Sequence, residues 1–195
     1  EADDTLRAEL SFTSAPHDEH LAVCVPLAGG RWNYTHKFAA FAVNGHVTIG
    51  DRRFDFVGDR SFGTMDFTKM YALRHSVWRW IAVCGRSESG AVVGINLVDP
   101  TPNAPISENA LWIDGKRHAL NHVQIAQDLS HASADGLELE MRDVAEVAQQ
   151  LDLPIVRHRL RHVIGAFTAR ITTTSGAREN IHAAVGIAED YDTWW

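Results

Sequence analysis

The residues best suited to chemistry lie in the stretch 61–86, SFGTMDFTKMYALRHSVWRWIAVCGR, where Asp66 precedes the alternating tryptophans Trp78 and Trp80. A carboxyl group in an apolar, aromatic pocket favours its neutral form and can donate a proton near neutral pH. Indole faces stabilise a developing positive charge, which the protonation of an isolated alkene requires. The stretch therefore predicts a site for acid-initiated chemistry on an apolar molecule, with Asp66 as the acid.

Two further groups that can handle protons are expected beside this carboxyl group. Tyr71 follows Asp66 in the same stretch, and His36 alternates with Tyr34 along residues 32–43. Because alternate residues of a strand share one face, the face that carries Tyr34 and His36 is expected to line the same pocket.

Each of these residues also has a purely structural interpretation. An Asp at the end of a strand often accepts hydrogen bonds in a turn, or pairs with a nearby cation such as Lys69 or Arg74. Large aromatic rings commonly fill the core of a β-barrel. A binding protein without chemistry is therefore the alternative to an enzyme.

The elements that must position these groups are strands. Residues 6–13 alternate as a half-buried antiparallel strand, and glycine turns are predicted at Gly29-Gly30, Asn44-Gly45 and Asp114-Gly115. The second arm of the central stretch alternates too, and both of its faces are partly apolar. Residues 143–151 are alanine-rich after a capping-box-like start and are expected to form a short helix. The pattern predicts an all-β antiparallel barrel or sandwich.

Composition excludes several classes of function. A net charge of −7 argues against a nucleic-acid partner, and no apolar run is long enough for a membrane span. The two cysteines, Cys24 and Cys84, lie in apolar runs where buried free thiols are expected. The eleven histidines lack the spacing of metal ligands, and no phosphate-binding or dinucleotide-binding glycine motif occurs. We expect a cytoplasmic protein with no cofactor and no metal.

Five short motifs in order resemble one known family. They are residues 31–37 (RWNYTHK), Gly63-x-x-Asp66, Trp78-x-Trp80, Gly94-x-Asn96-Leu97, and residues 107–111 (SENAL) with the turn at Asp114-Gly115. The chain resembles the DUF2804 family, an uncharacterised bacterial family. It is more remotely similar to the AttH-like and carotenoid 1,2-hydratase proteins, which resemble paired lipocalin-like barrels.

The resemblance implies a fold and a class of ligand. It implies a lipocalin-like (calycin-type) β-barrel acting on a hydrophobic, isoprenoid-like or polyketide-like molecule as a cofactor-free hydratase, isomerase or cyclase. Asp66 corresponds by motif to the acid of the hydratase relatives, although Phe67 and Thr68 depart from their pattern. The expected catalytic residues are Asp66, Tyr71 and His36. The expected binding residues are Tyr34, Asn33, Lys37, Lys69, Trp78, Trp80, Glu108 and Asn109.

The resemblance also bears on domain organisation. Residues 1–195 are expected to form a single lipocalin-like β domain, or the C-terminal barrel of a two-barrel protein. In the second case residues 1–26 would be the last strands of an N-terminal barrel or the linker from it. The apolar faces of residues 6–13 and of Trp78 and Trp80 would then meet that second barrel or a homodimer partner.

Overall fold

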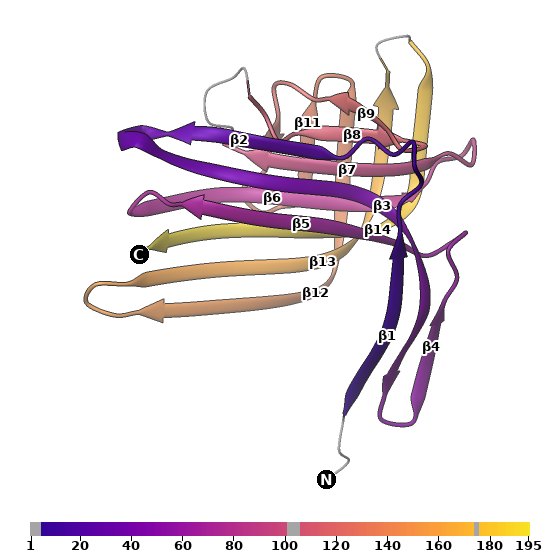
Figure 1. Cartoon of the computed structure of the whole chain (residues 1–195), viewed down its shortest axis with the longest axis horizontal. Helices are drawn as coiled ribbons and strands as arrows, with labels where there is room; N and C mark the ends of the chain where they lie inside the picture. The colour runs from indigo at the N-terminus through magenta and orange to yellow at the C-terminus, as the bar shows by residue number, and fades with distance from the viewer. Residues whose placement is uncertain (1–4, 101–105, 174–175) are drawn as a thin grey trace.

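The computed structural model describes residues 5–100, 106–173 and 176–195, and most of them belong to antiparallel strands (Figure 1). The strands in chain order are β1 Leu6–Thr13, β2 Leu21–Leu27, β3 Arg31–Ile49, β4 Arg52–Phe56, β5 Phe62–Tyr71, β6 His75–Arg86, β7 Val92–Asp99, β8 Ala110–Ile113, β9 Lys116–Ala119, β10 Gln124–Ile125, β11 His131–Ala134, β12 Leu137–Asp152, β13 Arg157–Thr172 and β14 Arg178–Trp194. The predicted antiparallel all-β fold is confirmed.

The larger sheet has nine strands in the order β10-β11-β12-β13-β14-β6-β7-β8-β9. It curls into a half-barrel around one apolar core, to which Ile81 of β6, Ile95 of β7 and Leu139 of β12 contribute fully buried side chains. Burial of such side chains supplies most of the stability of a sheet of this kind. The opposite face of β6, β7 and β8 is free to receive a second layer.

The smaller sheet provides that second layer and is built on the long strand β3. The first part of β3 pairs with β2 and β5, and its last part pairs with β1 and β4. Phe38 of β3 packs edge-on against Trp112 of β8, with ring centroids 5.8 Å apart. The contact between the sheets is close, because a Cβ added at Gly94 would lie 2.3 Å from the carbonyl oxygen of Ala39. Only glycine therefore fits at position 94 without moving the two layers apart.

The turn predictions are confirmed at two of three positions. A 3-10 turn at Ala28–Gly30 joins β2 to β3, and Asp114 and Gly115 join β8 to β9, both with positive φ. The prediction of a hairpin at Asn44-Gly45 is wrong, since β3 continues through both residues without interruption. A Cβ at Gly45 would lie 2.0 Å from the carbonyl oxygen of Glu9, so this glycine permits the close approach of β1.

The helix predicted at residues 143–151 is also wrong, because this segment belongs to β12. Residues 145–152 pair in register with residues 157–164 of β13, after a bulge that follows Asp143. This pairing with β13 along the whole segment outweighs the local preference of the alanines for a helix.

The strand β1 projects with β4 and the end of β3 away from the rest of the molecule (Figure 1). The register places Leu6 and Ile49 on one face, beside Ala8 and Phe54. The predicted strand is present, but the expected half-burial is wrong, because every residue of β1 is exposed and Leu6 is 64% accessible. An additional domain that would cover this face stays a prediction.

Candidate active site

A cavity of about 710 Å³ lies between the smaller sheet and the outer face of β6, β7 and β14. This volume lies within the range of about 300–1,000 Å³ that is usual for small-molecule sites. Its wall consists of Leu27, Asn33, Lys37, Asp66, Thr68, Met70, Leu73, His75, Ser76, Val77, Trp78, Trp80, Val98, Pro100, Glu108 and Glu189. Most of the wall is apolar or aromatic, and the charged groups on it are few.

The centre of the charged part is Lys37, whose side chain is only 4% exposed. Its Nζ lies 3.0 Å from Oδ2 of Asp66 and 2.9 Å from Oε2 of Glu108, so one ammonium bridges two carboxyl groups. The same Nζ lies 5.5 Å from the centroid of the Trp80 ring, within the range of a cation–π contact. A buried lysine is tolerated here because charge partners surround it.

The register between β3 and β5 explains why these groups meet. Directly opposite residues of an antiparallel pair share one face of the sheet. Lys37 is opposite Asp66, and Thr35 is opposite Thr68. Both threonine hydroxyls donate to Oδ1 of Asp66, at 3.3 Å and 3.1 Å. The Asp66 carboxylate is therefore held in one orientation, with its side chain 26% exposed.

A hydrogen-bonded chain in the larger sheet completes this side of the cavity. The indole Nε1 of Trp80 donates to Oδ1 of Asn96 at 2.7 Å, and Nδ2 of Asn96 donates to the carbonyl oxygen of Glu108 at 2.7 Å. Asn96 is buried, so this amide fixes both the tryptophan and the backbone that carries the glutamate. Trp80 and Glu108 are in this way both held next to the ammonium of Lys37.

The other indole of the pair belongs to a second group of contacts. Trp78 stacks on Tyr191 of β14 with centroids 3.8 Å apart, and its Nε1 donates to Oε1 of Glu189 at 2.7 Å. The second carboxylate oxygen of Glu189 is in close contact with Nε2 of His162. Glu189 and Tyr191 lie opposite Trp80 and Trp78 in the register between β14 and β6.

Six of the residues predicted to form the site line this cavity. They are Asp66, Trp78, Trp80, Lys37, Asn33 and Glu108. Asn109 does not line it: its Oδ1 accepts from the amide of Val98 at 2.6 Å, and its Nδ2 donates to the carbonyl of the same residue at 3.3 Å. Asn109 thus closes the end of the ladder between β7 and the segment before β8.

The remaining four predicted residues are on the opposite face of the smaller sheet. Tyr34 and Lys69 are directly opposite each other in the register, and Tyr71 is 57% exposed beneath the guanidinium of Arg31. The expectation that the face carrying Tyr34 would line the pocket of Asp66 is not met, because the alternation that turns Lys37 inward turns Tyr34 outward.

His36 also points away from the cavity, into a small polar cluster of its own. Its Nε2 lies 3.2 Å from Nδ1 of His20, and Nε2 of His20 lies 3.0 Å from the hydroxyl of Ser14. Burial lowers the pKa of His20, the neighbouring His36 lowers it further, and Asp18 acts in the opposite direction. None of the residues of this cluster is among those that line the cavity.

The structural interpretation of Asp66 as an ion-pair partner is correct, with a different partner from those expected. Lys69 lies on the other face of β5, and Arg74 donates to the carbonyl oxygen of Ile155 at 2.8 Å. Lys37 takes their place. The ion pair lies on the wall of a cavity and not in bulk solvent, so it is compatible with a functional role.

Sequence reasoning missed Glu189 and His162 as members of the site. Both are far from Asp66 in the chain, and only the pairing of β14 with β6 brings Glu189 to the cavity. A signal was present in Glu189 and Tyr191, which alternate on one face near the end of the sequence. The partner strand could not be inferred from that alternation.

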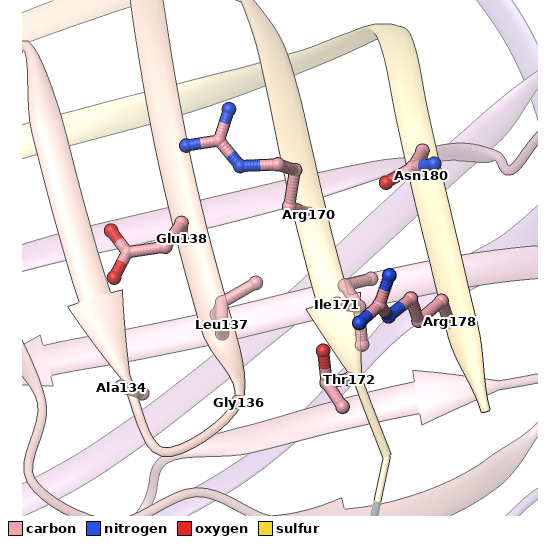
Figure 2. Close-up of a pocket in the computed structure, with 9 residues that line it drawn as sticks. All are labelled: Ala134, Gly136, Leu137, Glu138, Arg170, Ile171, Thr172, Arg178 and Asn180. Carbon is pink, nitrogen blue, oxygen red and sulfur yellow. The ribbon is translucent and has the colours of Figure 1, made fainter. Parts of the chain in front are cut away.

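A second hollow, of about 390 Å³, lies at the other end of β12, β13 and β14 (Figure 2). Its wall includes the charged residues Arg170, Arg178 and Glu138 and the apolar residues Leu137 and Ile171. Glu138 pairs with His131 at 3.3 Å, and the Arg170 side chain is 70% exposed. These polar groups are solvated at the surface, and for this reason the larger cavity is the candidate site.

Other kinds of site can be assessed over the same residues. Within residues 5–100, 106–173 and 176–195, no group of three or more His, Cys, Asp or Glu side chains is arranged to hold a metal ion. In that part of the chain there is also no helix with the length and apolar character needed to cross a membrane. Cys24 and Cys84 are both free, and Cys24 is exposed, so the expected burial of its thiol is wrong.

The fold and the site together define an antiparallel β protein with a ligand-sized cavity between two sheets and a buried ion cluster on the cavity wall. Within that class the chain belongs to the DUF2804 family, a domain of unknown function, whose model matches residues 2–195. The resemblance inferred from the five motifs is confirmed.

Comparison with solved structures finds kievitone hydratase from Nectria haematococca, with 9% sequence identity and a TM-score of 0.41. The match covers 97% of this chain and 68% of that chain. No curated protein matches the sequence.

Proposed function

We propose that this protein binds an apolar small molecule in the cavity between its sheets and that Asp66 transfers a proton to it. The observation that carries the proposal is the cluster of Lys37, Asp66 and Glu108 on a mainly apolar wall. In this cluster one ammonium faces two carboxyl groups, so it contains one acidic group more than it contains cations. Of the two carboxyl groups, that of Asp66 is the more accessible, with 26% of its side chain exposed against 9% for Glu108.

The proposed reaction is the hydration or isomerisation of an alkene without a cofactor. Asp66 in its protonated form gives its proton to one alkene carbon, the π electrons form the new C–H bond, and the adjacent carbon becomes cationic. Water then adds through its oxygen and returns a proton to a carboxylate, which gives the alcohol. Loss of a proton from a neighbouring carbon gives an isomer instead. Trp78 and Trp80 would stabilise the cation, and Lys37 would stabilise the carboxylate left behind.

The test begins with the molecule that the protein retains. The purified protein is examined by native mass spectrometry for the mass of a bound molecule. The small molecules in an organic extract of the folded protein are then compared with those in an extract of the same protein after unfolding. Isoprenoid alkenes such as geraniol and farnesol are then incubated with the protein in D₂O. Proton transfer to carbon places solvent deuterium in a C–H bond of the product, whether water adds or the double bond moves.

The variant Asp66→Asn separates catalysis from binding, because the amide keeps the shape but cannot give up a carboxylic proton. We expect loss of deuterium incorporation, with ligand affinity unchanged within about three-fold. Asp55→Asn is the matched control, since Asp55 is on β4 and its side chain is 63% exposed. Retained incorporation in Asp66→Asn would overturn the catalytic proposal. Ligand retention without any turnover by the wild type would leave a binding protein.

A further inference from the structure

The cavity wall carries more carboxylates than ammonium groups. Three carboxylates line it, those of Asp66, Glu108 and Glu189. Among the lining residues of the described chain, Lys37 brings an ammonium, and His75 pairs with Asp192 outside the wall. The wall is therefore suited to a positive charge, in a place that is otherwise largely apolar.

The protein already shows how this wall accommodates a positive charge. The ammonium of Lys37 lies between carboxylates and beside the ring of Trp80. The combination of an indole face and a carboxylate recurs at Trp78 and Glu189, which are joined by a hydrogen bond of 2.7 Å. At this second combination the partner of the carboxylate is the imidazole of His162 and not an ammonium.

Contacts with neighbouring side chains hold Trp78 and Glu189 in place. One face of the Trp78 ring is covered by Tyr191, so the rest of the ring is what the residue presents to the cavity. The Glu189 side chain is 13% exposed, and both of its oxygens are engaged, one by the indole and one by His162. An aromatic face beside a carboxylate is the usual means by which proteins bind organic cations.

We propose that the ligand of this cavity is an apolar molecule that bears one positive charge, held beside the Trp78 ring and the Glu189 carboxylate on the cavity wall. The charge can belong to an amine that is present in the ligand, or it can develop on carbon during the proposed reaction. The inference rests on the proposed function only in taking this cavity as the ligand site. It adds a preference for cations, which an apolar lining alone would not give.

The experiment compares three probes of the same length: decylammonium, decanol and decanoate. Each is titrated by calorimetry at neutral pH in about 0.15 M salt, where long-range attraction to the acidic protein is screened. We expect decylammonium to bind at least ten-fold more tightly than decanol, and decanoate to bind most weakly. Equal affinity for decylammonium and decanol would overturn the inference.

Two variants locate the source of the preference. Glu189→Gln should reduce the ratio of the two affinities to three-fold or less while decanol binding is retained. Glu140→Gln removes a carboxylate that is 63% exposed on β12 and should leave the ratio unchanged. A ratio that survives Glu189→Gln, or that falls equally in the control, would overturn the assignment to Glu189.

The two sources of charge are distinguished in the same series. Tight binding of decylammonium together with deuterium transfer to alkenes indicates a cation that forms during reaction. Tight binding without such transfer indicates an amine ligand and removes the catalytic proposal while the inference stands. Deuterium transfer without a preference for decylammonium would support the catalytic proposal and overturn the inference. The proposed function and the inference can therefore fail separately.

Discussion

Replacing Lys37 by Met is the most informative perturbation of the site, because it removes the only ammonium between Asp66 and Glu108 in the described cluster. Breaking a buried ion pair by deleting one partner costs about 3–5 kcal/mol, since the other charge is left without compensation. Part of the Asp66 side chain reaches solvent, which moves the expected cost to the lower end. We therefore expect a loss of about 3 kcal/mol in the free energy of unfolding.

The loss can be measured by urea unfolding and by the thermal midpoint. For a chain of this size about 1 kcal/mol lowers the midpoint by about 2–4 °C, so a decrease of about 6–12 °C is expected. Lys69→Met is the matched control, because Lys69 is exposed on the other face of β5 and should change stability by less than about 0.5 kcal/mol.

Neutralising the carboxylates in the Lys37→Met background provides the decisive comparison. Replacement of Asp66 by Asn and of Glu108 by Gln removes the uncompensated charges, so we expect about 2 kcal/mol of the loss to be regained. If Lys37→Met is as stable as the Lys69→Met control, the ion cluster does not exist as described. If the triple variant is less stable than Lys37→Met, the loss arises from packing and not from charge.

Three further predictions concern other parts of the molecule. The pKa of His20 is lower in the folded chain than its ordinary value of about 6.5, because of burial and then of His36, so the unfolded chain binds the extra proton first. The contribution of His20 to the free energy of unfolding should therefore be fully present above about pH 6.5 and should fall as the pH decreases below it. A His20→Gln variant should show a flatter pH profile of urea unfolding. An equally steep profile would exclude His20 as the cause. Burial raises the pKa of the Cys84 thiol to about 11. A thiol reagent at pH 8 should therefore modify only Cys24 in the folded chain, and both cysteines in denaturant. Rapid modification of a folded Cys24→Ser variant would contradict this. Gly94→Ala should lower the free energy of unfolding by about 2–3 kcal/mol because its Cβ meets backbone of Ala39, and a neutral effect would show that the sheets are not in contact there.

The fold was accessible from sequence wherever a pattern was local. Alternation along residues 76–84 correctly placed Trp78 and Trp80 on one face, and Asp114-Gly115 correctly marked a hairpin. Predictions failed where a distant strand decided the outcome. The glycine at position 45 looked like a turn but serves the approach of β1, and residues 145–152 looked helical but are held by β13.

The site was accessible to the extent that its members lie close to a recognisable motif. Asp66, Lys37 and both tryptophans were found, but Tyr34 and His36 were predicted with them although they lie on the other face of β3. Alternation shows which residues share a face but not which face points inward, when both carry apolar groups. Trp78 and Trp80 line the cavity together with residues of the smaller sheet, and a second barrel against this face stays a prediction.

The position of β14 has a consequence for how the chain folds. This strand follows all the others in sequence but lies in the middle of the larger sheet, where it pairs with β13 on one side and β6 on the other. Trp194 lies opposite His75, so the two halves of the sheet are joined by contacts between residues far apart in the chain. Such non-local pairing makes folding slow and leaves strand edges exposed until it is complete. The stacking of Trp78 on Tyr191 forms at that step, and its fluorescence would time the closure of the sheet.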